Sequence, residues 1–151
     1  MLVLWLFSFG HSLNLFLSAM SKTGFVASSF DLLHAGHCLM LRDASMQCDH
    51  LIVALQTDQT IDRPIKNKPI QSFPERMIQL EAIRYIDEIV VYNTEQELLE
   101  WLKILKPDVR ILGSDYKDKD FTGMELDIEI YYHDRSHDWS TTNLRNKIKI
   151  N

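Results

Sequence analysis

Cysteine is scarce in this 151-residue chain, which contains only Cys38 and Cys48. They do not form a C-x-x-C pair and are too few for a disulfide scaffold, so we expect two reduced thiols in or near the core. Basic residues are also outnumbered, with 16 Lys and Arg against 21 Asp and Glu and a formal net charge of -5. Nucleic-acid-binding domains are usually basic, which argues against a nucleic-acid partner. Local clusters of Lys and Arg would have to hold any anionic ligand.

Long apolar runs are absent except at residues 1–19. A signal peptide is not indicated there because a positively charged start is missing. The run is also marginal for a membrane span, which needs about 20 mostly apolar residues. Met20 opens MSKTGFVASSFD, which is typical of a cytosolic start. We expect residues 1–19 to be a non-functional extension or an early start, with an extra packed segment or a membrane association as alternatives, and 20–151 to be one cytoplasmic domain.

Proline and glycine are sparse, at 4 and 5 residues, and no linker or repeat divides the chain. From Lys22 onward apolar strand patterns alternate with helical ones. Strands are expected at 24–28, 51–55, 88–92, 109–112 and 128–132, and helices at 36–47, 72–85, 94–106 and 140–148. This rhythm predicts a Rossmann-like α/β fold with three α/β/α layers and a mostly parallel sheet. In such sheets ligands bind at the carboxyl ends of the strands.

Two helix starts carry capping-box patterns, Ser72 with Glu75 and Thr94 with Glu97. Residues 57–71 have no apolar period and are expected to form a polar loop. The segment 122–128 is too short for a helix before the last strand. That strand is therefore expected either to pair differently or to leave an open edge.

The densest group of reactive side chains is SSFDLLHAGH, residues 28–37, between the first strand and the first helix. Helix N-termini bind phosphate through free N–H groups and the helix dipole, and Gly36 would let an anion approach the backbone. The imidazoles of His34 and His37 could donate hydrogen bonds to phosphoryl oxygens as charge builds up. Two alternatives remain open: a metal site that adds Cys38, and histidines with only a structural role.

FDLLHAGH at 30–37 resembles the H-x-G-H signature of the cytidylyltransferase-like branch of the nucleotidylyltransferase superfamily. Further resemblances follow in family order, at ALQTD, FPER, IRYIDE, GSDY and WSTT, and extend over about 23–150. The resemblance implies a nucleotidylyltransferase fold, a homodimer and an enzyme. In that reaction the phosphate of a small acceptor attacks the α-phosphorus of CTP or ATP, and pyrophosphate leaves. Catalysis would be positioning and charge stabilisation, with Mg²⁺ accompanying the triphosphate and no metal bound by the protein itself.

The resemblance also implies roles for individual residues. The expected catalytic residues are His34, His37 and Lys66. The expected substrate-binding residues are Asp31, Asp58 and Arg84. The expected nucleotide-binding residues are Ser29, Phe30, Gly36, Arg76, Gly113, Asp115, Tyr116, Arg135, Ser140, Thr141 and Thr142.

Some positions depart from the family pattern. Ser28 replaces the usual glycine, and R-T-E-G-I-S-T-T becomes RSHDWSTT at 135–142. These changes leave a non-catalytic nucleotide-binding module as an alternative. FDLLH and IRYIDE resemble the glycerol-3-phosphate cytidylyltransferase type, and DRP at 62–64 with GSDYK at 113–117 resembles the ADP-heptose-forming type. We favour CTP and a small phosphorylated polyol or sugar, with ATP and a sugar 1-phosphate as the alternative.

Overall fold

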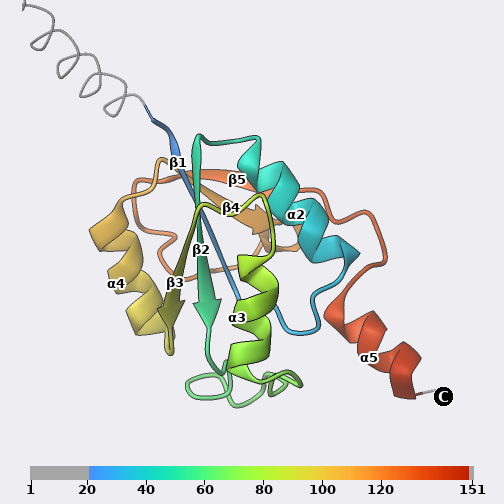
Figure 1. Ribbon diagram of the computed structural model, residues 1–151. Coiled ribbons are helices and arrows are strands. Elements are labelled where there is room, and N and C mark those ends of the chain that lie inside the picture. Colours follow the sequence, from blue (N-terminus) through green and yellow to red (C-terminus); the bar gives the residue numbers. More distant parts are fainter. Residues whose placement is uncertain (1–20, 150–151) are drawn as a thin grey trace, which may run out of the picture.

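The computed structural model describes residues 21–149. Five strands form one sheet in the order β3-β2-β1-β4-β5, and every neighbouring pair is parallel. The strands are β1 Thr23–Ser28, β2 His50–Gln56, β3 Glu88–Tyr92, β4 Val109–Gly113 and β5 Glu129–His133. The predicted parallel α/β fold is confirmed (Figure 1).

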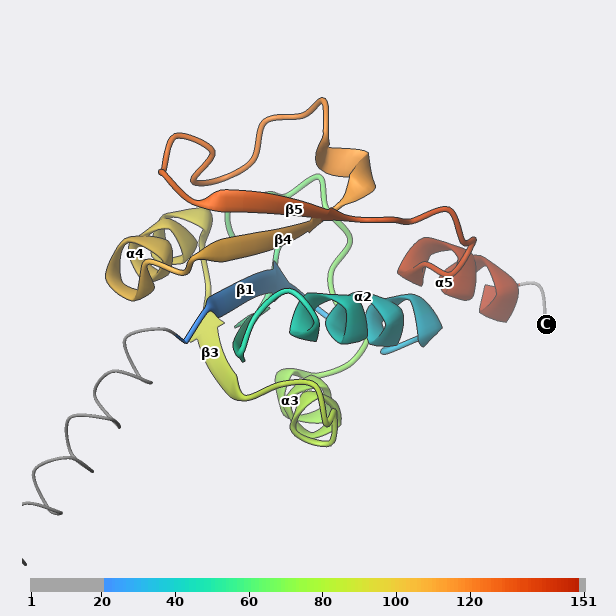
Figure 2. The ribbon, with the colours of Figure 1, turned by 90° about the horizontal axis from the view of Figure 1, so that it is seen from above.

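The helices are α2 Ala35–Ser45, α3 Phe73–Glu81, α4 Glu95–Leu105 and α5 Thr141–Lys149. Figure 2 shows α2 and α3 on one side of the sheet and α4 on the other. The expectations for residues 1–19 lie outside the described residues. Within 21–149, no helix is both long and apolar enough to cross a membrane.

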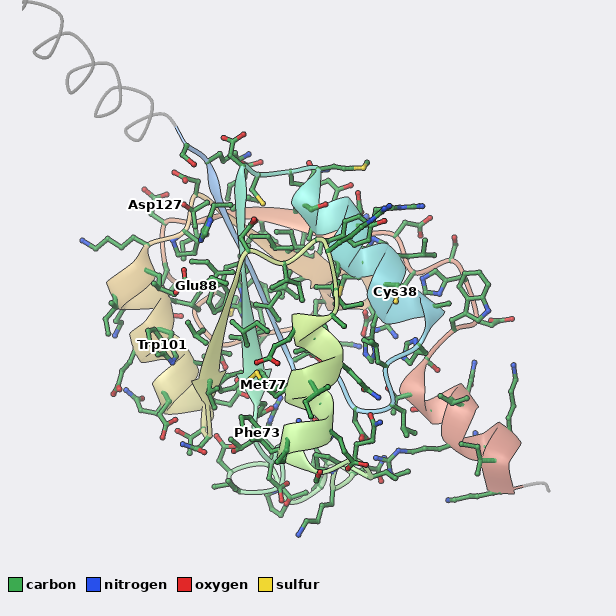
Figure 3. All side chains as sticks on the ribbon, viewed as in Figure 1. Cys38, Phe73, Met77, Glu88, Trp101 and Asp127 are labelled. Carbon is green, nitrogen blue, oxygen red and sulfur yellow. The ribbon has the colours of Figure 1, made fainter. Side chains whose placement is uncertain are left out.

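The buried strand β2 supplies both halves of the core. Because side chains alternate along a strand, Leu51, Val53 and Leu55 pack with α2 and α3, while Ile52 and Ala54 pack with α4. Figure 3 labels side chains of α3 and α4 that cover the two halves of the core from outside. Phe73 and Met77 of α3 cover one half, and Trp101 of α4 covers the other, where its indole N–H donates to the Val91 carbonyl at 2.9 Å. Cys38 and Cys48 are both free thiols of intermediate burial.

The two capping predictions had different outcomes. Ser72 forms the full capping box with Glu75. At the second start the Thr94 side chain accepts from the Glu97 N–H, but the Glu97 carboxylate accepts from the Asn93 N–H at 2.7 Å instead of closing the box. α3 also ends at Glu81, earlier than predicted, and its apolar continuation to Tyr85 is a series of turns.

The connection from β4 to β5 contains the short 3-10 helix η1, Ser114–Tyr116, and no α-helix. The strand β5 nevertheless pairs in parallel with β4, with Ile111 opposite Tyr131, so a different pairing was the wrong alternative. The strand order reverses beside β1, which lies between β2 and β4. Ligands are expected at the carboxyl ends of the strands beside such a reversal.

Candidate functional site

A cavity of about 720 Å³ lies at the carboxyl ends of the strands. It brings together thirteen of the predicted site residues from four separate segments. They are Ser29, Asp31, His34, Gly36, His37, Lys66, Gly113, Asp115, Tyr116, Arg135, Ser140, Thr141 and Thr142. Phe30, Asp58, Arg76 and Arg84 are not among the residues that line it.

The two histidines lie at the first turn of α2 with their rings stacked, 3.9 Å between centroids. His34 is the N-cap, and its Nδ1 accepts from the His37 backbone N–H at 3.4 Å. Because Nδ1 accepts, Nε2 carries the proton in the neutral ring. That proton points to Thr141 Oγ1 at 3.3 Å, and Thr141 in turn donates to the Asp31 carbonyl.

Burial keeps both imidazoles neutral. The pKa of His37 is lowered to about 3, mainly by burial and then by the adjacent His34 and Arg135, while the negative charge of Asp31 acts in the opposite direction. Burial also lowers the pKa of His34, with further contributions from Arg135 and His137. A bound polyanion would reverse these electrostatic effects, because it favours positive charge beside it. The two imidazoles are therefore neutral when no anion is bound, and the site favours an anionic ligand.

The segment after β5 folds over the N-terminus of α2. A Cβ at Gly36 would lie 2.5 Å from the Trp139 carbonyl oxygen and 3.0 Å from the rings of His34 and His137. Gly36 is thus required for packing of this segment against the helix, where we had expected it to admit an anion. The His137 ring also stacks on Trp139 at 5.3 Å.

The ends of β4 and β5 are joined by an ion pair between Arg135 and Asp115 at 2.8 Å. A Cβ at Gly113 would lie 2.5 Å from Asp115 Oδ1 and 2.7 Å from Arg135 Cδ. Gly113 therefore lets these two side chains meet at the cavity wall. Both are partly exposed, so they remain accessible to a ligand.

Asp31 is buried, and protein groups occupy its carboxylate. It accepts from the N–H groups of Ile70 and Gln71 and from Arg145, whose Nη2 lies 2.7 Å away. Burial acts to raise the pKa of Asp31, but the hydrogen bonds from Gln71, Ile70 and Arg145 lower it overall. Arg145 also donates to the Lys68 carbonyl at 2.9 Å. Asp31 thus connects α5 to the 57–71 loop, and the geometry gives little support to a substrate contact.

Arg76 is fully buried in α3, where it binds backbone carbonyls. Its guanidinium donates to the carbonyls of Ser29 and Gln56 at 2.7 Å each, to Gln71 at 3.2 Å and to Thr57. These contacts hold together the segments after β1 and β2. The structure therefore gives Arg76 a structural position, although we predicted nucleotide contact.

Three other predicted residues also have local partners. Phe30 is buried in the core with φ of 47°. Asp58 accepts from Thr60 within its own turn, through both the N–H and the hydroxyl. Arg84 is exposed and lies against the ring of Tyr85. Their assigned roles stay predictions without geometric support.

A second group of cavity residues was missed, and we call it the arginine cluster: Gln56, Arg63, Tyr92, Glu95, Arg110 and Thr122. Its signal in the sequence is Arg110, a charged residue inside the otherwise apolar strand β4. Its neighbours Val109 and Ile111 face α2 and α3. By strand alternation, Arg110 faces the α4 side of the sheet.

A metal ion has no ready protein cage in this cavity. Among residues 21–149, no three His, Cys, Asp or Glu side chains are grouped so that they could hold one. Mg²⁺ commonly keeps several waters and binds through substrate phosphates with one or two carboxylates. The residues present therefore fit an ion that arrives on a triphosphate better than a resident one.

Comparison with known proteins identifies the family of this chain. A family model described as cytidylyltransferase-like matches residues 25–149. Bifunctional protein HldE of Campylobacter fetus is 35% identical over 127 residues, which is 83% of this chain and 27% of the relative. HldE of Helicobacter pylori is 35% identical over 129 residues, 85% of this chain and 28% of the relative. The chain thus spans about a quarter of the length of these curated relatives.

A solved structure supports the fold. The lipopolysaccharide core biosynthesis protein from Thermoplasma volcanium superimposes with a TM-score of 0.60. The match covers 76% of this chain and 95% of that one, at 22% sequence identity. At this identity the likeness concerns the fold alone.

Proposed function

The chain belongs to the cytidylyltransferase-like family of nucleotidyltransferases, and we propose that it transfers a nucleotidyl group to a small phosphorylated acceptor. A phosphate oxygen of the acceptor attacks the α-phosphorus of a nucleoside triphosphate. The bond from that phosphorus to the bridging oxygen breaks, and pyrophosphate leaves with the electron pair. An ionised phosphate is already a nucleophile, so no general base is needed.

The observation that carries this proposal is the stacked pair His34 and His37 at the N-terminus of α2, with Thr141 beside it. Imidazole N–H groups, a helix N-terminus and a hydroxyl are all donors that phosphoryl oxygens accept from. A bound phosphate would take over the donors that His34 and Thr141 now use for the internal bonds to Thr141 and Asp31. Lys66, exposed in the 57–71 loop, lines the same cavity and would neutralise charge that develops on the leaving pyrophosphate. Mg²⁺ would arrive with the triphosphate and supply further charge neutralisation.

The donor is CTP or ATP, and different observations favour each. The motifs FDLLH and IRYIDE favour CTP and a glycerol-3-phosphate-like acceptor. Relatives of the HldE type favour ATP and a sugar 1-phosphate, in line with the resemblance of 113–117 to the ADP-heptose-forming type. The homodimer also stays a prediction, and light scattering during gel filtration tests it.

The test is pyrophosphate release from CTP, ATP, GTP and UTP with Mg²⁺ and a panel of polyol and sugar phosphates. We expect release with one donor, and its loss in His34→Ala and His37→Ala with the fold intact. His50→Ala is the matched control, since His50 lies at the opposite end of β2 and pairs with Glu88. Activity that survives both changes contradicts the proposal. Triphosphate binding without release for any acceptor favours a non-catalytic module.

A further inference from the structure

The arginine cluster contains a buried charge that the nucleotide site does not use. Arg110 is 4% exposed, and its guanidinium lies over the ring of Phe121 at 5.3 Å. Nη1 donates to the Thr122 carbonyl. Arginine keeps its charge in proteins, and a buried charge is costly unless it is paired and hydrogen-bonded. A single neutral carbonyl does not balance Arg110.

The cluster contains two arginines but one carboxylate, and that carboxylate pairs with Arg63. Glu95 pairs with Arg63 at 2.9 Å and accepts from the Thr122 hydroxyl. Arg63 also donates to Gln56 Oε1 at 2.8 Å. The two guanidiniums and the one carboxylate give a formal net charge of about +1.

Other charges nearby do not cancel this excess. Asp120 lines the cavity and Asp62 accepts from the Glu95 N–H at 2.6 Å. Both carboxylates are exposed, so water screens their charges. Glu125 opposes the lowering of the Arg110 pKa, as the smallest of the named causes, and it too is exposed. Burial lowers the pKa of Arg110, with Tyr92 and Glu95 opposing that shift. The cluster therefore has an electrostatic reason to bind an anion.

Several donors in the cluster have no protein acceptor. The Nε atoms of Arg110 and Arg63 are both buried without a partner in the described part of the chain. Burial raises the pKa of Tyr92, so its hydroxyl keeps its proton and can donate. Unused N–H and O–H donors around one net positive charge match the oxygens of a carboxylate or a second phosphate.

We propose that the arginine cluster binds the non-reacting end of the acceptor, and that this end is acidic. The acceptor would then be a small phosphorylated acid, with its attacking phosphate toward His34 and His37 and its second anionic group at Arg110. This assignment rests on the proposed function for the direction of the acceptor. A neutral hydroxyl tail would leave the excess charge of Arg110 unbalanced. The histidine pair lies on the α2 side of the sheet and Arg110 faces the α4 side. One acceptor must therefore extend across the cavity from His34 and His37 to Arg110.

The sharpest test uses two compounds that differ only at the far end. Glycerol 3-phosphate ends in a hydroxymethyl group and 3-phosphoglycerate ends in a carboxylate. Calorimetry measures the binding of each to the whole protein, with glucose 1-phosphate and glucuronate 1-phosphate as a longer pair. Hydrogen bonds to charged groups are the stronger class, so we expect the acidic member of one pair to bind about 10- to 100-fold tighter. Equal binding, tighter binding of the neutral member, or no binding of any of the four overturns the proposal.

Two variants change the charge in opposite directions. Arg110→Gln removes the excess charge and should bring the acid-to-neutral affinity ratio close to one. Glu95→Gln removes the balancing carboxylate and should raise that ratio above the wild-type value. If thermal melting shows that Arg110→Gln is not folded, the Glu95→Gln variant decides. A cluster with a purely structural role predicts no increase in the acid-to-neutral affinity ratio of Glu95→Gln. An unchanged or lowered ratio in Glu95→Gln overturns the proposal.

Failure of this inference and failure of the proposed function have different signatures. Pyrophosphate release that prefers neutral acceptors supports the proposed function and contradicts the acidic subsite. Acid-selective binding that depends on Arg110, without pyrophosphate release from any triphosphate, supports the subsite and contradicts the proposed enzymatic function. His34→Ala should abolish release but leave the acid-to-neutral ratio unchanged.

Discussion

Replacing Arg76 by alanine should destabilise the fold strongly, because this side chain satisfies four backbone carbonyls from a buried position. A hydrogen bond to a charged group contributes about 1.5–3 kcal/mol, so four would sum to at least about 6 kcal/mol if they were additive. Water entering the vacated space would satisfy some carbonyls. We therefore expect a loss of about 3–5 kcal/mol in the free energy of unfolding.

Urea unfolding followed by circular dichroism measures this loss. With a denaturant slope of about 1–3 kcal/mol per molar, the midpoint should fall by at least about 1 M. Arg84→Ala is the matched control, since Arg84 follows the same helix, is exposed, and contacts the adjacent Tyr85. It should change stability by less than about 0.5 kcal/mol. A loss below about 1 kcal/mol in Arg76→Ala, with triphosphate binding abolished, would refute the structural role and restore the predicted ligand contact.

Three further predictions concern the cavity. Gly36→Ala should displace the segment at Trp139, whose carbonyl oxygen lies 2.5 Å from the new Cβ, and should weaken triphosphate binding in calorimetry while the circular dichroism spectrum is retained. The pKa of His37 is about 3 in the folded protein, below the 6.5 of the unfolded chain. Between these two values the unfolded state binds more protons. The free energy of unfolding therefore decreases as the pH is lowered through this window, by up to about 1.4 kcal/mol per pH unit. His37→Asn should show a shallower fall in urea titrations from pH 7 to pH 4, and an unchanged slope would contradict the pKa. Arg145→Leu removes the bonds to Asp31 and Lys68, so trypsin should cleave the 57–71 loop faster, whereas equal rates would show that α5 does not restrain that loop.

The sheet could be predicted because its strands are short apolar runs separated by polar turns. The run LIVAL in β2 is apolar on both faces because helices cover both sides of the sheet. The end of α3 was harder to predict. Ile83, Tyr85 and Ile86 stay partly buried against the core although the chain there forms turns. The apolar pattern therefore continues past the point where the helix ends.

The histidine side of the candidate site could be located from its motif. A strand, a polar turn and a helix start define where His34 and His37 must lie. The stacking partners of His137 and the close contact at Gly36 could not be predicted, because they depend on how the segment after β5 folds back over α2.

The roles of the arginines could not be read from the sequence, because they depend on which acceptors each guanidinium meets in the fold. Arg76 was predicted to contact nucleotide, yet its donors are already bound to carbonyls. Arg110 was overlooked in an apolar strand, yet its Nε is buried without a partner in the described chain. A guanidinium whose N–H groups are satisfied stabilises the fold, whereas one with unused donors beside a cavity is available to a ligand. By this criterion Arg110, rather than Arg76, is the arginine whose replacement should change what the cavity binds.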